Sequence, residues 1–225
     1  MERSRTVERQ QSIDSAALLC LERFVWEGGG FVGVGEPSAV QRGGRYFQLA
    51  DVLGVDQDMG ERCCHGKISY EKQERFLDSM EVFAKNGSGR TATEIAGSFQ
   101  GTNGIYLTDL ATEVLAETVA YSPIGEEVHT PKLTIHPYGK GCGIYLSHFV
   151  YDVENSRFLL ELLLKAAGKE NVAEQLGDNP YCETAYFPCS GKAVAVNNSG
   201  QVQKLHVNVG GVDKELELKP YSSKL

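Results

Sequence analysis

The chain has 225 residues, 41 % of them hydrophobic and 23 % charged, with a formal net charge of −8. This composition is typical of a globular protein with one or two cores, and its acidic surface disfavours nucleic acid and anionic membranes as partners. No apolar stretch is long enough to span a bilayer, and residues 1–14 lack the apolar core of a secretion signal. We therefore expect a cytoplasmic protein whose six cysteines, none in a C-x-x-C pair, stay reduced.

The start of the chain predicts a helix, a glycine stop and a strand. Residues 15–27 repeat apolar side chains at helical spacing, and Gly28–Gly30 ends that helix. Phe31–Val34 is expected to be a short strand buried on both faces. A second short helix is predicted over residues 46–53.

The middle of the chain gives weaker signals. The pattern of residues 71–85 is compatible with a helix. Residues 86–104 are expected to be a loop because Gly, Ser and Thr dominate there. Strands are predicted at residues 105–107, 132–137 and 143–149.

The clearest helix is "ENSRFLLELLLKAAGKE". Asn155 or Ser156 is the expected cap, and Gly168 the expected end. Its predicted buried stripe is Phe158, Leu159, Leu162, Leu163 and Ala166.

From Tyr181 onward, short alternating segments are separated by Pro, Asn and Gly. This pattern of short alternating segments predicts a small antiparallel β-domain, and the regular spacing of its strands suggests a sandwich. The predicted organisation is a polar segment at 1–14, an α/β domain at 15–176 and a β-domain at 181–225.

Gly28-Gly29-Gly30-Phe31-Val32-Gly33 satisfies the dinucleotide pattern G-x-G-x-x-G. That fingerprint needs a strand before its glycines and a helix after them, so that the helix N-terminus faces the pyrophosphate. The predicted order here is the reverse, which makes the glycines structural. Gly33-Val34-Gly35 ends the strand instead, and the loop after it is a candidate ligand-facing edge.

Glu36 occupies the turn where some α/β folds present a nucleophile. The chain has no G-x-S-x-G, and a catalytic Glu36 would need a partner carboxylate or histidine that the sequence does not identify. The alternative is that Glu36 hydrogen-bonds a neighbouring loop or faces solvent. Arg42, Arg45 and Lys140 can bind an anion, or can form surface ion pairs.

Cys63-Cys64-His65 is the one sequence cluster that suggests a metal. Adjacent cysteines chelate one ion poorly, and no second cluster completes a four-ligand set, so no metal is expected. The remaining histidines are isolated in the sequence and are interpreted as structural or surface residues. They are His129, His136, His148 and His206.

The block "GGGFVGVGEPSAVQRGGRYFQLADVLGVD" closely resembles the central domain of the 1,3-β-galactosyl-N-acetylhexosamine phosphorylases (galacto-N-biose/lacto-N-biose phosphorylases). The similarity resumes at "TEVLAE", "YGKGCGIYLSHF" and "VENSRFLLELLLKAAGKE" and continues through "AVAVNNSG". It covers most of residues 15–225 and is least at 62–104.

The resemblance implies three parts: a catalytic barrel, a central glutamine-amidotransferase-like (Rossmann-like) α/β domain and a C-terminal β-domain. It also implies reversible phosphorolysis of β-1,3-galactosyl-N-acetylhexosamines to α-galactose 1-phosphate and N-acetylhexosamine, without metal or organic cofactor. The resemblance places the general acid in the barrel, which this sequence lacks, so no catalytic residue is carried over.

Three functional hypotheses follow. The first is a non-catalytic portion of a galactoside phosphorylase, in which Glu36, Gln41, Arg42 and Arg45 contact phosphate or sugar. Its expected partners are galactoside and phosphate once a barrel completes the site, and a second copy or a barrel-bearing chain. The second is a stand-alone binding or oligomerisation module. The third, a hydrolase or amidotransferase with a cysteine nucleophile, is disfavoured because no cysteine follows the Phe31–Val34 strand.

One structural expectation accompanies these hypotheses. The resemblance implies that strands of the α/β domain would precede residue 15. Without them, we expect the sheet to have an unpaired strand edge and the 15–27 helix to have an uncovered apolar face. We therefore expect the isolated chain to oligomerise, to pair with a barrel-bearing chain or to be poorly stable.

Overall fold

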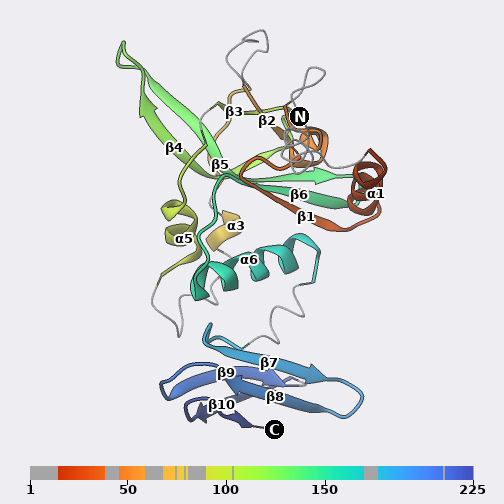
Figure 1. Ribbon diagram of the computed structural model, residues 1–225, viewed down its shortest axis with the longest axis vertical. Coiled ribbons are helices and arrows are strands. Elements are labelled where there is room, and N and C mark those ends of the chain that lie inside the picture. The colour runs from red at the N-terminus through yellow and green to blue at the C-terminus, as the bar shows by residue number, and fades with distance from the viewer. Residues whose placement is uncertain are drawn as a thin grey trace, which may run out of the picture. The chain divides into compact units, whose positions relative to one another are not determined.

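The computed structural model is mixed α/β and contains more strands than helices (Figure 1). It describes residues 15–38, 46–58, 68–73, 75–78, 80, 90–102, 104–169, 177–209 and 211–224. The helices are α1 (Ser15–Trp26), α2 (Ala50–Leu53), α3 (Arg75–Asp78), α5 (Ala92–Ser98) and α6 (Val153–Ala166). The strands are β1 (Gly30–Val34), β2 (Val55–Gln57), β3 (Ile105–Leu107), β4 (Glu113–Tyr121), β5 (Glu127–Tyr138), β6 (Gly141–Leu146), β7 (Cys182–Phe187), β8 (Lys192–Asn197), β9 (Gln203–Val209), β10 (Val212–Leu218) and β11 (Ser223–Lys224).

The chain divides into two compact units. The first comprises residues 1–76 and 96–150, and the second comprises residues 77–95 and 151–225. The first contains a four-stranded sheet in the order β1-β6-β5-β4 and a small β2-β3 sheet. Only β1 and β6 run parallel among the paired strands of that larger sheet.

The predicted order of helix, glycines and strand is confirmed. α1 ends at Trp26, and Gly28 follows with a φ of +119°, which is accessible to glycine but strained for other residues. β1 then begins at Gly30 and pairs with Cys142 at the start of β6. The glycine cluster therefore reverses the chain from helix into sheet, and its backbone is not arranged at a helix N-terminus.

The prediction that Phe31–Val34 is buried on both faces is wrong. β1 is an edge strand of its sheet, and only Gly33 in it is buried, whereas Phe31 and Val32 are half-buried. The side chain of Val34 is 41 % exposed. An apolar run alone does not distinguish a central strand from an edge strand.

The core of the first unit joins α1, α2 and the sheet. Its largest fully buried side chains include Phe47, Leu49, Leu53 and Tyr145. The second predicted helix is shorter than expected, because residues 46–49 form a bridge and a turn before α2 begins at Ala50.

The prediction of a loop over residues 86–104 is wrong where α5 forms. Thr91 Oγ1 accepts the N–H of Glu94 at 3.1 Å, and Glu94 Oε2 accepts the N–H of Thr91 at 2.7 Å. This reciprocal capping box, T-A-T-E in the sequence, starts a helix in spite of the surrounding small residues.

The helix predicted over residues 71–85 is reduced to α3 in the described part of the chain. Lys72 instead forms an isolated parallel bridge with Val114, so residues 71–73 are not helical. Residues 74, 79 and 81–89 lie outside the described residues.

The sequence analysis missed β4 and underestimated β5. The two strands form an antiparallel hairpin with a register shift near Ala116. Where β5 also pairs with β6, Lys132, Thr134 and His136 are buried, so the expected alternation of buried apolar and exposed polar side chains fails there.

In the second unit, α6 is capped by Asp152, whose side chain accepts the N–H of Asn155 at 2.7 Å. The predicted cap, Asn155 or Ser156, is therefore wrong by one turn. Within the predicted stripe, Phe158 and Leu162 are buried, whereas Leu159 and Leu163 are half-buried.

The strands after residue 181 form two antiparallel sheets, β11-β8-β7 and β10-β9, as the alternating pattern predicts. Cys182, Ala195, Leu205 and Leu218 form a small buried cluster that draws on β7, β8, β9 and β10.

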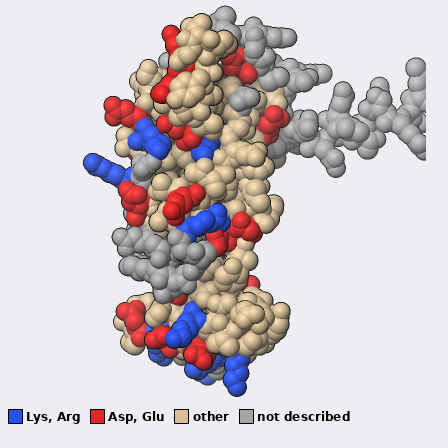
Figure 2. All heavy atoms as spheres, turned by 90° about the vertical axis from the view of Figure 1, so that its left-hand side faces the viewer, with Lys and Arg blue, Asp and Glu red and all other residues tan. Residues whose placement is uncertain are grey.

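The surface carries both signs of charge. On the face shown in Figure 2, acidic and basic side chains are interspersed, and no continuous basic area is visible there. None of the helices in the described residues has the length and apolarity needed to cross a membrane.

Candidate functional site

The turn after β1 lies at the carboxyl end of the parallel β1–β6 pair, the edge at which open α/β sheets bind ligands. Gly35 adopts φ +71° and donates its N–H to Leu146 O at 2.8 Å. A Cβ on Gly33 would lie 2.7 Å from Pro37 Cγ, so the close packing of this turn requires glycine. The turn thereby fixes the position of Glu36.

The two flanks of the segment 39–45 are bound to each other. Glu36 Oε2 accepts the hydroxyl hydrogen of Tyr46 at 2.9 Å. Ser38 accepts the N–H of Gln48 through its backbone oxygen at 3.1 Å, and the N–H of Leu49 through its Oγ at 3.0 Å. Residues 36–38 and 46–49 are therefore held next to each other at the end of β1.

Asp56 anchors the second flank. Its carboxylate is buried and accepts three backbone N–H groups, from Tyr46 at 3.1 Å, Phe47 at 2.8 Å and Gln57 at 2.8 Å. The Tyr106 hydroxyl adds a longer contact of 3.4 Å. These contacts tie residues 46 and 47 to the start of β2.

Of the four predicted site residues, only Glu36 lies within the described part of the chain. Its contact with Tyr46 corresponds to the structural alternative, a hydrogen bond to a neighbouring segment. Burial and the Glu36 carboxylate raise the pKa of Tyr46. The other three candidates, Gln41, Arg42 and Arg45, lie outside the described residues.

Tyr145 lies beneath this edge in β6 and is fully buried. Burial raises the pKa of its phenol to about 12, so the group stays protonated at neutral pH. Its Oη and the Oγ1 of Thr134, which is directly opposite on β5, are both buried, and neither has a partner with hydrogen-bond geometry among the described residues. These two hydroxyls are a polar feature that the sequence analysis missed.

The structure does not bring the histidines together. His129 lies between Glu117 and Glu127, His136 is buried against the Thr112 hydroxyl, and His206 contacts Asp178. Among the described residues, no group of three or more His, Cys, Asp or Glu side chains is arranged to hold a metal. Cys63, Cys64 and His65 lie outside these residues.

The buried cysteines are not activated nucleophiles. Burial raises the pKa of the Cys142 and Cys182 thiols, which keeps both protonated at neutral pH. Among the described residues, neither of them forms a disulfide, and the exposed Cys20 and Cys189 form none either.

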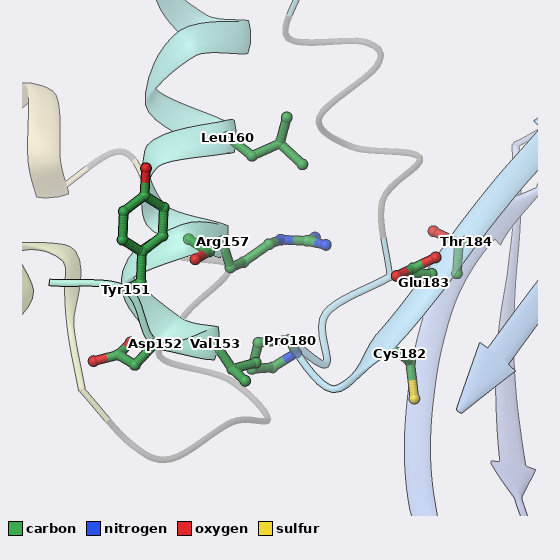
Figure 3. A pocket seen from close by; sticks show the side chains of 10 residues that line it. Tyr151, Asp152, Val153, Arg157, Leu160, Pro180, Cys182, Glu183 and Thr184 are labelled. Atoms are coloured by element: carbon green, nitrogen blue, oxygen red, sulfur yellow. The ribbon is translucent and has the colours of Figure 1, made fainter. Parts of the chain in front are cut away.

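A separate groove of about 630 Å³ lies in the second unit, between the first turns of α6 and the start of β7 (Figure 3). Arg157 extends from α6 toward the β7 side of this groove. Its guanidinium is bound to Glu161 Oε1 at 2.7 Å and to Gly177 O at 2.5 Å. The groove is lined by Tyr151, Asp152, Val153, Ser156, Arg157, Leu160, Pro180, Cys182, Glu183 and Thr184.

Because these contacts already compensate the Arg157 charge, the arginine tethers residue 177 to α6 and is not prepared for an anion. Burial raises the pKa of Glu161, and the adjacent guanidinium opposes that shift. The i,i+4 spacing of Arg157 and Glu161 was the sequence signal for the pair, although not for its burial.

Comparison with protein families identifies both parts of the chain. Residues 10–171 match the lacto-N-biose phosphorylase central domain, and residues 176–225 match the lacto-N-biose phosphorylase C-terminal domain. This chain belongs to the lacto-N-biose phosphorylase family. The predicted resemblance is thus confirmed.

Two curated relatives in this family differ in the substrate that their names give. A D-galactosyl-β-1→4-L-rhamnose phosphorylase of Lachnoclostridium phytofermentans is 35 % identical over 85 % of this chain and 23 % of its own length. A 1,3-β-galactosyl-N-acetylhexosamine phosphorylase of Bifidobacterium longum subsp. longum is 33 % identical over 87 % of this chain and 28 % of its own length. The chain therefore spans about a quarter of the length of these relatives.

A solved structure, the cold-adapted β-galactosidase from Rahnella sp. R3, is similar in fold with a TM-score of 0.53 and 15 % identity. The match covers 95 % of this chain and 30 % of that enzyme. This likeness concerns the fold alone.

Proposed function

We propose that this chain is the non-catalytic central and C-terminal portion of a phosphorylase that transfers the galactosyl group of a β-galactoside to inorganic phosphate. The products are α-galactose 1-phosphate and the free acceptor sugar. The observation that carries the proposal is that phosphorylase relatives align with at least 85 % of the chain. In this proposal the general acid lies in a barrel outside these 225 residues.

The candidate contribution of this chain to the active site is the segment that follows β1. Arg42 and Arg45 supply planar donors for phosphate oxygens, and Glu36 and Gln41 accept from sugar hydroxyls. The hydrogen bonds of Tyr46, Ser38 and Asp56 support this role, because they hold both flanks of the segment at the ligand-facing edge of the sheet.

The proposed organisation is a polar segment at 1–14, a glutamine-amidotransferase-like domain at 15–176 and a β-sandwich domain at 181–225. The parallel β1–β6 pair with α1 packed against it supports the first assignment. The cluster shared by β7, β8, β9 and β10 supports the second. Cys142 and Cys182 form no disulfide among the described residues, which fits the reducing conditions of the cytoplasm.

A second candidate function, an oligomerisation module, is favoured by the outer face of α1. Leu19, Phe24 and Trp26 are 65 %, 55 % and 58 % exposed, while Val25 is fully buried. A helix that is apolar on both faces is usually covered on both. The open edge of β1 adjoins it, so a second copy or a barrel-bearing chain is the expected partner.

A chimera tests the first function. The region of the Bifidobacterium relative that aligns with this chain is replaced by the 225 residues, and release of galactose 1-phosphate is measured with inorganic phosphate and either galactoside. We expect turnover well above that of a second chimera carrying an unrelated domain of equal length. A folded chimera with no turnover on either galactoside would contradict the proposal.

A further inference from the structure

The β4–β5 hairpin extends beyond the sheet to which it belongs. β6 pairs with β5 only between Leu133 and Tyr138, whereas β4 and β5 pair with each other as far as Tyr121 and Glu127. Figure 1 shows this two-stranded extension projecting past the end of β6. We call residues 118–129 the arm. Every residue of the arm is exposed except Ser122, which is half-buried.

The arm exposes large apolar side chains that no third strand covers. The exposed fraction is greatest at Ile124 in the turn, with 80 %, and at Tyr121, with 71 %. Val119 and Val128 are exposed as well. A lone two-stranded hairpin is marginally stable in water, and an exposed apolar strand pair favours aggregation unless it has a partner. The arm therefore has the properties of a contact element.

Polar contacts hold the arm in an ordered conformation. His129 contacts Glu117 at 3.2 Å through Nδ1 and Glu127 at 3.4 Å through Nε2. The hydroxyl of Tyr121 donates to Glu127 at 3.3 Å, and that of Tyr70 donates to Glu117 at 3.1 Å. This chain of contacts runs from the base of the hairpin toward its tip, which lowers the ordering cost of binding.

The arm itself is acidic. Residues 118–129 contain Glu126 and Glu127 and no Lys or Arg, and Glu117 precedes them at the base of the hairpin. A surface that combines this charge with exposed apolar side chains is complementary to a cationic surface with an apolar recess.

We propose that the arm docks at the electropositive rim of the phosphate-binding catalytic part of the phosphorylase. This inference rests on the proposed function, because a site that binds inorganic phosphate must gather cationic side chains, whose field extends to its rim. Tyr121 and Ile124 fill an apolar recess in that rim, and Glu126 and Glu127 meet its cations. The same negative charge disfavours nucleic acid and anionic lipid as partners.

Hydrogen exchange compares the free 225-residue chain with the chimera that carries the barrel of the Bifidobacterium relative. We expect the arm amides to exchange at least about tenfold more slowly in the chimera, because docking excludes water from them. In the chimera, Y121S/I124S should abolish this protection and lower kcat/KM at least about tenfold. The matched control is L110S, at a residue that is 83 % exposed but lies outside the arm, and it should change neither quantity.

The outcomes separate the two claims. An active chimera whose arm exchanges as fast as in the free chain overturns the docking proposal and leaves the proposed function standing. An inactive chimera with a protected arm supports docking and contradicts the proposed function. Arm protection that rises with the concentration of the free chain overturns the inference in favour of a second copy.

Discussion

The Asp56 carboxylate fixes the backbone that follows the 39–45 segment. Three backbone N–H groups converge on it, two of them from Tyr46 and Phe47 directly after that segment. Its neighbours in the chain, "LGVD", give no hint of this role. The contact joins residues about ten apart through a buried carboxylate, and only the folded chain shows it.

Substituting Asp56 with Asn should destabilise the protein by about 2 kcal/mol, because a neutral amide oxygen is a weaker acceptor than the carboxylate Oδ1 that receives all three backbone N–H groups. An NH₂ group in place of Oδ2 would also face the N–H of Tyr46, which lies 3.2 Å from that oxygen. Urea denaturation measures the effect. D109N is the control, since Asp109 is exposed and accepts a single N–H, from Ala111. Equal stabilities for D56N and D109N would show that the anchor is unimportant.

His136 makes stability depend on pH. Its burial lowers its pKa, and the charges of Asp109 and Asp51 oppose that shift only in part. The unfolded chain therefore binds the proton more tightly than the folded protein, so the contribution of His136 to stability is present above about pH 6.5 and is lost as the pH falls below that value.

As the pH falls from 7.5 to 5, the free energy of unfolding should therefore decrease less for H136Q than for the parent chain. The control H148Q changes an exposed histidine and should keep the parental slope. The measurement is urea denaturation at each pH. If H136Q and the parent gave parallel curves, burial of the neutral ring would not be the cause.

At the level of elements, α6 shows how a cap can be misassigned from sequence. Asn155 and Ser156 are both good caps by residue type, but Asp152 lies one turn earlier and its carboxylate receives the N–H of Asn155. Asn155 itself is buried inside the helix. Cap preference by residue type does not fix the register of the first turn.

D152A should therefore destabilise the chain by about 1 kcal/mol, the usual cost of removing an N-cap side chain. S156A should have almost no effect, because Ser156 is exposed on the second turn. Thermal unfolding of the two variants checks this assignment. A larger loss for S156A than for D152A would restore the cap that the sequence suggested.

Elements whose apolar residues recur at a regular spacing were predictable. Elements that depend on contacts with residues distant in the sequence were not. α1 and α6 carry regular apolar stripes, and their positions were confirmed within a few residues. β4 was missed because "TEVLAETVAY" mixes Ala, Glu and β-formers, and its strand form depends on pairing with β5. The family assignment was also available from sequence, since its motif block is long and specific.

The site itself was only partly predictable. The glycine turn after β1 and Glu36 were found from local pattern, but the contacts of Tyr46, Ser38 and Asp56 were not. Pairing of the segment flanks depends on the fold of the sheet beneath them. The structural role of the glycines, in contrast, followed from the order of helix and strand alone.

For the whole molecule, the expected uncovered helix face is present on α1. L19S/F24S should reduce binding of an apolar dye and reduce self-association of the isolated chain, because these residues supply its exposed outer surface. The control L160S changes a residue on α6 that is 42 % exposed, and it should change neither property. Sedimentation velocity and dye fluorescence are the measurements. A parent chain that is a monomer and binds no dye would contradict this account of α1.

The central claim is that these 225 residues supply scaffold and ligand-facing surface, while the chemistry lies in a catalytic barrel outside them. The most direct test incubates the purified chain alone with inorganic phosphate and a β-1,3-galactosyl-N-acetylhexosamine or a β-1,4-galactosyl-rhamnose, and measures galactose 1-phosphate. The account predicts no product above the enzyme-free control. Product formed in proportion to the concentration of the chain, and absent from a matched preparation without the chain, would contradict the account.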